Sequence, residues 1–155
     1  MTYPPRNKHN DRNKGRSEGP SVKVLFDLDK SNAELFDSLA EQQCKSLTRI
    51  NSNQLRRFFG EIKDLYRRFN SLTTGTDGED TERIYHQQIE PLFKMVRSKV
   101  SYATKTGGQS KLNNDFATML SEGIGKVKSH EDFCRFVLHL EAVVGFMYGH
   151  GKVGR

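Results

Sequence analysis

The chain has 155 residues, of which 34% are apolar, and a formal net charge of +6 at pH 7. This length predicts one domain, and the low apolar content means that part of the chain cannot join a core. No apolar run approaches the roughly 18 residues of a membrane-spanning helix, while the positive charge favours an acidic partner such as nucleic acid, an anionic membrane or an acidic protein.

The first stretch of the chain predicts a basic arm outside the folded part. Residues 1–20 are rich in Pro, Gly, Asn and charge, and their large apolar side chains are those of Met1 and Tyr3. Such a segment buries too little apolar surface to offset the entropy of ordering it. It also lacks the apolar run of a secretory signal. We therefore predict a disordered basic arm over residues 1–21 and a single helical domain over residues 22–155.

Residues after 30 predict helices almost throughout, because apolar residues recur with helical spacing and no run of strand alternation is convincing. Ser31 and Glu34 have the spacing of a capping box, and Ser129 and Asp132 repeat it. Pro91 interrupts the third helical region, where it either kinks the helix or starts a new one. The helices are expected at about residues 32–46, 52–70, 81–104, 113–126 and 129–148. The predicted fold is all-α, a compact bundle of about five helices.

The segments outside these helices predict loops and a loose end. Residues 71–80 are rich in Thr, Gly and Asp and are expected to be an exposed loop. Residues 149–155 are expected to be a frayed tail. Cys44 and Cys134 lie within helical patterns, which favours reduced, buried thiols over a disulfide.

Motifs of the common catalytic and metal sites are absent from the sequence. Its five histidines have no recognised zinc spacing, and there is no P-loop, dinucleotide-binding glycine set or nucleophile elbow. An acid–base ribonuclease built on His86 or His139 is left open, although nothing in the sequence singles out a second catalytic group beside either. We therefore predict a binding protein without enzymatic activity, metal or cofactor.

The helix predicted over residues 52–70 has an apolar stripe and a basic line beside it. The stripe, typical of a core-facing side, consists of Leu55, Phe58, Phe59, Ile62, Leu65, Tyr66 and Phe69. Arg56, Lys63 and Arg67 align next to it, and a phosphate-facing role is favoured for them. Gly60 lies close to that line and would let another backbone approach, at a cost of about 1 kcal/mol relative to Ala.

A second basic line on the same helix consists of Arg57 and Arg68, and it shares its side with two acids. Ion pairs of Arg57 with Glu61 and of Arg68 with Asp64 would make it an ordinary solvated flank. This interpretation and a functional one weigh equally.

The third helical region also has an apolar face with basic residues beside it. Its apolar face consists of Tyr85, Ile89, Leu92, Phe93, Val96, Val100 and Ala103. Lys94, Arg97 and Lys105 share an adjoining face, and residues 91–111 hold five basic side chains without one acid, which is unusual for a merely solvated surface. Tyr102 either stacks on a base or covers the core, and the core is favoured.

The last predicted helix is apolar on two sides. Its main stripe consists of Phe133, Phe136, Val137, Leu140, Val144 and Met147, and its second side of Leu138, Ala142, Gly145 and Phe146. Such a helix is either central in its bundle or contacts a partner, and the sequence leaves both open.

Three stretches resemble, in this order, the signatures of a known family. They are "LTRINSNQLRRFFGEIKDL", "LFKMVRSKVSYATKT" and "DFCRFVLHLEAVVGFMYGHGK". Over residues 39–152 the chain resembles the small helical subunit of type III-A CRISPR–Cas (Csm) effector complexes. It departs from the family at Ser98, where the family often has Pro, and in its longer basic N-terminus.

The resemblance implies a non-catalytic, cytoplasmic subunit of an antiviral ribonucleoprotein. Several copies would stack head-to-tail beside the backbone and large subunits, along the duplex of guide RNA and target RNA, and contact its phosphates without reading sequence. By position, it carries an RNA-binding role to Gln54, Arg56, Arg57, Lys99 and Tyr102. The helix faces add Lys63, Arg67, Lys94, Arg97 and Lys105. The alternatives are an independent basic helical nucleic-acid-binding protein and, more weakly supported, an adaptor for an acidic protein.

Overall fold

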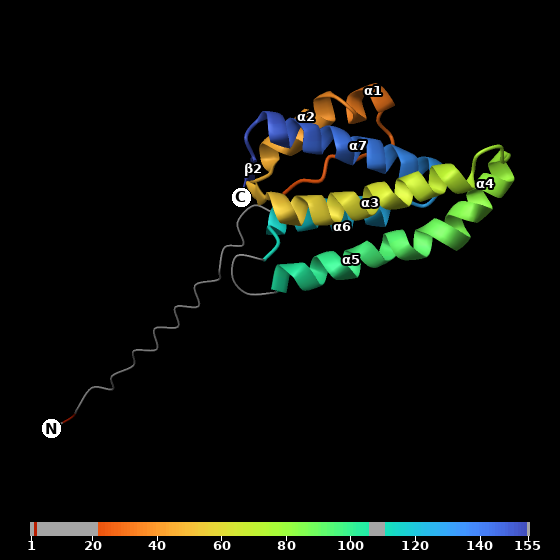
Figure 1. Cartoon of the computed structure of the whole chain (residues 1–155). Helices are drawn as coiled ribbons and strands as arrows, with labels where there is room; N and C mark the ends of the chain where they lie inside the picture. The colour runs from red at the N-terminus through yellow and green to blue at the C-terminus, as the bar shows by residue number, and fades with distance from the viewer. Residues whose placement is uncertain (1, 3–21, 106–110, 155) are drawn as a thin grey trace.

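The structure of the chain is a computed structural model that describes residues 2, 22–105 and 111–154. Its helices are α1 (Asn32–Leu35), α2 (Ser38–Ser46), α3 (Ser52–Leu72), α4 (Gly78–Ile84), the π-helical turn η1 (Tyr85–Ile89), α5 (Glu90–Lys105), α6 (Asn114–Lys126) and α7 (His130–Gly149). Since α1 and α2 follow one another closely, and α4, η1 and α5 form one continuous rod, these correspond to the five predicted helices (Figure 1). The predicted all-α fold is confirmed. The arm predicted over residues 1–21 lies, apart from Thr2, outside the described residues.

Polar caps start α1 and α7 where the sequence predicts them. The Ser31 hydroxyl accepts the Glu34 backbone N–H at 3.2 Å, and the Glu34 carboxylate accepts the Ser31 backbone N–H at 3.1 Å. Ser129 and Asp132 form the same box at the start of α7. The single helix predicted over residues 32–46 is interrupted at Asp37, whose φ of −132° and ψ of −91° are not helical, so α2 begins anew.

The chain stays helical around Pro91, and α5 begins at Glu90, where the second of the two predicted alternatives placed a helix start. Pro91 has no backbone N–H, and its ring would press on the carbonyl of Gln87, four residues earlier, in a regular helix. The chain instead widens into η1 just before it, where the Glu90 backbone N–H donates to the Tyr85 carbonyl, five residues back. The helix therefore continues to Lys105, and Asp77 caps its start at Gly78.

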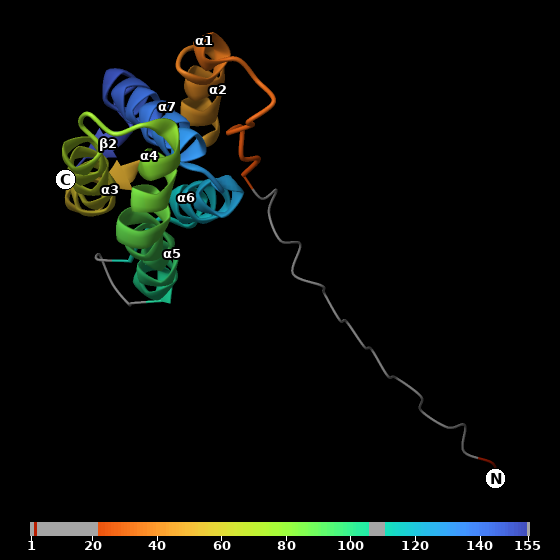
Figure 2. The same cartoon turned by 90° about the vertical axis from the view of Figure 1, so that its right-hand side faces the viewer.

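The core surrounds α7, which packs against α2, α3 and α6 and lies between α2 and α3 in both views (Figure 2). The ring of Phe133 is at its centre, with centroid distances of 5.8 Å to Phe69, 5.4 Å to Tyr85 and 4.9 Å to Phe93. Val143 is buried beside the predicted main stripe. Ala142 and Phe146 of the second apolar side are half-buried against this core, so the central position of α7 explains part of that side.

The predicted apolar stripes of α3, α5 and α7 are buried or half-buried with one exception. Leu92 is 40% exposed, because the buried positions of α5 continue from Ile89 to Phe93 and Val96 and leave Leu92 at the edge. Cys44 and Cys134 are free thiols, as predicted, with Cys44 buried and Cys134 half-buried. Burial raises the pKa of Cys134 to about 11.

The frayed tail predicted over residues 149–155 is wrong for its described part. The strands β1 (Ile50–Asn51) and β2 (Val153–Gly154) pair in parallel. In addition, the Lys152 ammonium donates to three backbone carbonyls at the end of α2, those of Cys44, Lys45 and Leu47, at 2.7, 3.0 and 2.6 Å. The last carbonyls of a helix have no partner within it, so Lys152 supplies one and anchors the tail.

Among the described residues, no helix is long and apolar enough to cross a membrane.

Candidate nucleic-acid interface

Helix α3 has a buried side and an exposed side. Leu55, Phe58, Ile62, Leu65 and Phe69 are buried. The opposite side is exposed and carries Arg56, Arg57, Arg67 and Arg68. Helix α3 packs against α7, α5 and η1 and also contacts both strands, and these four exposed arginines lie on the outer surface of the bundle.

An open groove of about 450 Å³ follows this outer side of α3. It is lined by Arg56, Arg57, Gly60, Glu61, Asp64, Leu65 and Arg68, and we call it the α3 groove. Because the groove is open to solvent and lined by α3 alone, it suits an extended ligand better than an enclosed small molecule.

The two acids of the α3 groove already have basic partners. Glu61 pairs with Lys99 of α5, and Asp64 pairs with Arg67 at 2.9 Å. The alternative pairs, Arg57 with Glu61 and Arg68 with Asp64, are not formed.

The remaining guanidinium groups of the α3 groove are therefore uncompensated. Within the described part of the chain, Arg56, Arg57 and Arg68 have no carboxylate partner, and Arg57 lies 5.1 Å from the ring centroid of Phe58. Lys99 and Arg67 thus raise the positive potential of the groove by neutralising its acids.

Besides Lys99, two of the predicted RNA-binding residues contact a neighbouring helix. The Lys63 side chain is 17% exposed and pairs with Glu141 of α7 at 3.2 Å. The Lys94 ammonium donates to the carbonyls of Ile124 and Val127, at the end of α6, at 2.7 and 2.6 Å. Burial lowers the pKa of Lys94. Both lysines join neighbouring helices, which does not favour the phosphate-facing position that their spacing predicted.

The other predicted residues lie on more than one side of the bundle. Lys99 contacts α3, whereas Lys94 contacts α6 from another side of α5, and a step of about 100° per residue places Arg97 on the α6 side as well. Arg97 and Lys105 are exposed, and Gln54 is half-buried in the first turn of α3.

Tyr102 is 71% exposed, so the expectation that it covers the core is wrong. The ten residues do not form one continuous surface. Their contacts with RNA remain predictions, for which Arg56 and Arg57 have the most favourable positions.

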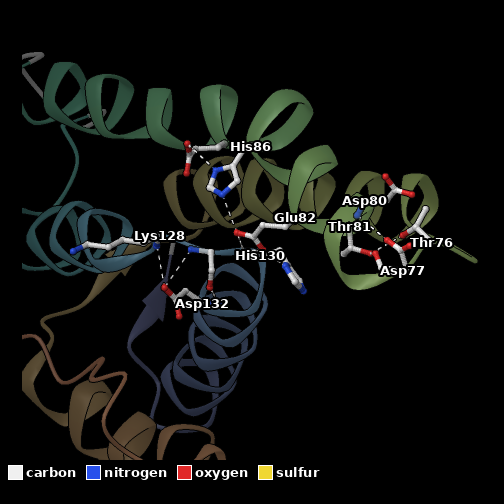
Figure 3. A network of polar contacts seen from close by, with 11 residues as sticks. Thr76, Asp77, Asp80, Thr81, Glu82, His86, Lys128, His130 and Asp132 are labelled. Carbon is white, nitrogen blue, oxygen red and sulfur yellow. Dashed lines mark hydrogen bonds and ion pairs between the residues drawn. The ribbon is translucent and has the colours of Figure 1, made fainter.

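A polar network near η1 brings together groups that the sequence did not connect (Figure 3). Glu82 receives the backbone N–H of His130 at 3.1 Å and contacts the ring of His130, and its other oxygen lies 2.8 Å from His86 Nε2. The second ring nitrogen of His86 lies 3.3 Å from Glu90. Glu82 thereby connects α4 to the first turn of α7.

The charges of this network stabilise one another. Partial burial opposes the charged forms, but the hydrogen bonds and charges of Glu90 and Glu82 raise the pKa of His86 overall. Hydrogen bonds from His130 and His86, together with the charge of His130, lower the pKa of Glu82 against the effect of burial. In the part of the chain that the structure describes, no group of three or more His, Cys, Asp or Glu has the geometry of a metal site. The arrangement fits a structural junction better than a catalytic pair.

His139 is buried inside the bundle. Its Nδ1 atom lies 2.6 Å from the Leu35 carbonyl, and no described group pairs with Nε2. Burial lowers the pKa of His139, so the ring is neutral near pH 7. It packs 5.4 Å from the ring centroid of Phe26 and serves the core.

Comparison with known proteins gives a family match. The family model described as Csm2 Type III-A matches residues 30–152. No curated protein and no solved structure matches the chain. The matched range begins just before the Ser31 cap, ends at Lys152 and includes all the helices from α1 to α7. The resemblance drawn from the sequence motifs is therefore confirmed, and the chain belongs to the Csm2 Type III-A family, the small subunit of the type III-A Csm complex.

Proposed function

We propose that the chain is a non-catalytic RNA-binding subunit that contacts the phosphate backbone of the guide RNA–target RNA duplex through the outer side of α3. The observation that carries this proposal is the α3 groove, in which Arg56, Arg57 and Arg68 are uncompensated while both acids are neutralised. The groove lies within the family-matched residues.

Arginine–phosphate contacts suit a subunit that must accept any guide. A guanidinium group donates two parallel hydrogen bonds to phosphate oxygens and reads no base. Base pairing between guide and target supplies the sequence specificity in RNA-guided complexes. Binding of this kind releases counterions and weakens steeply as salt increases.

Several copies stack head-to-tail in this proposal, beside the backbone and large subunits, in the cytoplasm. Head-to-tail stacking requires two different surfaces on each copy. The outer side of α7 is proposed as one of these surfaces. Leu138, Ala142 and Phe146 remain partly exposed there, and Gly145 is exposed.

The test is a double charge reversal, Arg56→Glu with Arg57→Glu, in the full chain. Both side chains are exposed and lack carboxylate partners, so helix content and melting temperature should stay nearly unchanged. Affinity for RNA duplexes of two unrelated sequences should fall at least about tenfold for both. The slope of log K against log salt should decrease by about 2.

The matched control is Lys23→Glu with Lys30→Glu, which changes the net charge equally at two exposed side chains in the segment before α1. It should leave most of the affinity in place. Equal losses in both double variants would mean that overall charge, and not the outer side of α3, drives binding. A loss for one RNA sequence and not the other would mean base readout.

A further inference from the structure

Gly60 lies in the middle of α3, and nothing in the described structure requires a glycine there. Glycine destabilises a helix interior relative to alanine. A Cβ atom added at Gly60 would have no heavy atom within 4 Å, and its φ is not in the left-handed region.

Two other glycines have an evident reason. At Gly123 a Cβ would lie 2.4 Å from the Phe136 ring, so close packing requires the glycine. At Gly75 the φ of 78° requires it. Gly125 and Gly145 share the open surroundings of Gly60, so open space alone does not explain a glycine, and what distinguishes Gly60 is the set of arginines around it.

The side chains around Gly60 favour a ligand that contacts the helix backbone at this point. Arg56 and Arg57 lie one turn before it, and Arg68 lies two turns after it, all three lining the α3 groove. Along the helix axis Arg57 and Arg68 are about 16 Å apart, so one extended strand can cross between them and contact both.

The chemistry of the α3 groove favours a polyanion over a protein partner. Its acids are occupied, its unpaired groups are guanidinium groups that match phosphate oxygens, and its apolar lining residue, Leu65, is only 8% exposed. The core of a protein interface normally contains exposed apolar anchors, which this groove lacks.

We propose that the sugar–phosphate backbone of one RNA strand crosses α3 at Gly60, in van der Waals contact with the helix backbone and between the arginine pair Arg56–Arg57 and Arg68. This inference rests on the proposed function and goes beyond it by fixing the crossing point and by adding Gly60 and Arg68 to the interface. A methyl group at residue 60 would lift the strand from the helix.

The test compares Gly60→Ala with Gly125→Ala in the full chain. Gly125 is exposed near the end of α6, and its added Cβ would also meet nothing within 4 Å. Since alanine favours a helix over glycine, neither variant should lower the melting temperature, and Gly60→Ala should raise it by a few degrees. Gly60→Ala should lower the affinity for a duplex RNA of arbitrary sequence about tenfold, and Gly125→Ala should leave it unchanged.

Full RNA affinity in Gly60→Ala would overturn the inference. If that variant also failed to incorporate into the guide-RNA-containing complex, the contact at Gly60 would be with a protein. Neither outcome decides the proposed function, which the Arg56→Glu, Arg57→Glu variant tests independently.

Discussion

Replacing Lys94 with methionine separates a structural role from an RNA-binding one. Methionine keeps most of the apolar stem and removes the ammonium that donates to the Ile124 and Val127 carbonyls at 2.7 and 2.6 Å. Hydrogen bonds from a charged group contribute about 1.5–3 kcal/mol each. The burial that lowers the pKa of Lys94 opposes part of this gain.

The expected net loss for Lys94→Met is about 2 kcal/mol of unfolding free energy, or about 6 °C in melting temperature for a chain of this size. Thermal melting followed by circular dichroism measures it. The salt dependence of RNA affinity, measured well below the melting temperature, should stay unchanged. The exposed Lys45, paired with Glu41 on the surface of α2, provides the control, since Lys45→Met should cost less than about 0.5 kcal/mol.

The reasoning about Lys94 fails if Lys94→Met melts within a degree of the wild type and binds RNA with a lower salt slope. Lys94 would then be a phosphate ligand, as its spacing in the sequence predicts.

Three further outcomes are expected. Lys152→Met should cost about 2 kcal/mol, seen as a lower midpoint of urea unfolding, since three carbonyls at the end of α2 lose their donor. The pKa of His86 is raised in the folded state, so its contribution to stability is complete below the ordinary histidine pKa and disappears as pH rises through the pKa of the folded state. The pKa of His139 is lowered in the folded state, so stability falls as pH drops below the ordinary histidine pKa. Melting temperature should therefore decline on both sides of about pH 6.5, and His86→Gln should flatten the alkaline side alone. A tagged chain isolated from its native host should carry guide RNA with it, and its purification free of RNA and other subunits would contradict the assignment to the complex.

Local patterns were enough to predict most helices and the starts of α1 and α7, but not the break at Asp37 or the start of α4 at Gly78, inside the predicted loop of residues 71–80. The Ser31 and Ser129 caps depend on residues three positions away, and the buried stripe of α3 follows from a period of 3.6. These features were correct because their physical cause lies within one helix.

Contacts between distant segments could not be predicted in the same way. Lys94 donates to carbonyls at least 30 residues away in the sequence, and Lys152 donates to carbonyls more than 100 residues away. Nothing near a lysine in the sequence marks such a partner. Glu61 could pair with Arg57 on its own helix, yet it pairs with Lys99 of α5, because the approach of α3 and α5 decides between them.

The candidate surface was also predicted correctly only where its features depend on a single helix. Helical spacing placed Arg56 and Arg57 correctly on an exposed side of α3. It could not tell which basic residues of α3 and α5 would turn toward a neighbouring helix, and so it included Lys63 and Lys94. It also gave Gly60 no more than a supporting role, since the open space around it is visible only in three dimensions.

The pairing of β1 with β2 has a consequence for synthesis on the ribosome. Ile50 is opposite Val153, so about a hundred residues are translated between the two partners. During that time the edge of β1 and the end of α2 have no lasting ligand, and contacts of such long sequence separation form late in folding. A premature stop before Lys152 would therefore release a chain in which the helices are present, but the pairing of β1 with β2 and the hydrogen bonds of Lys152 to the end of α2 are missing.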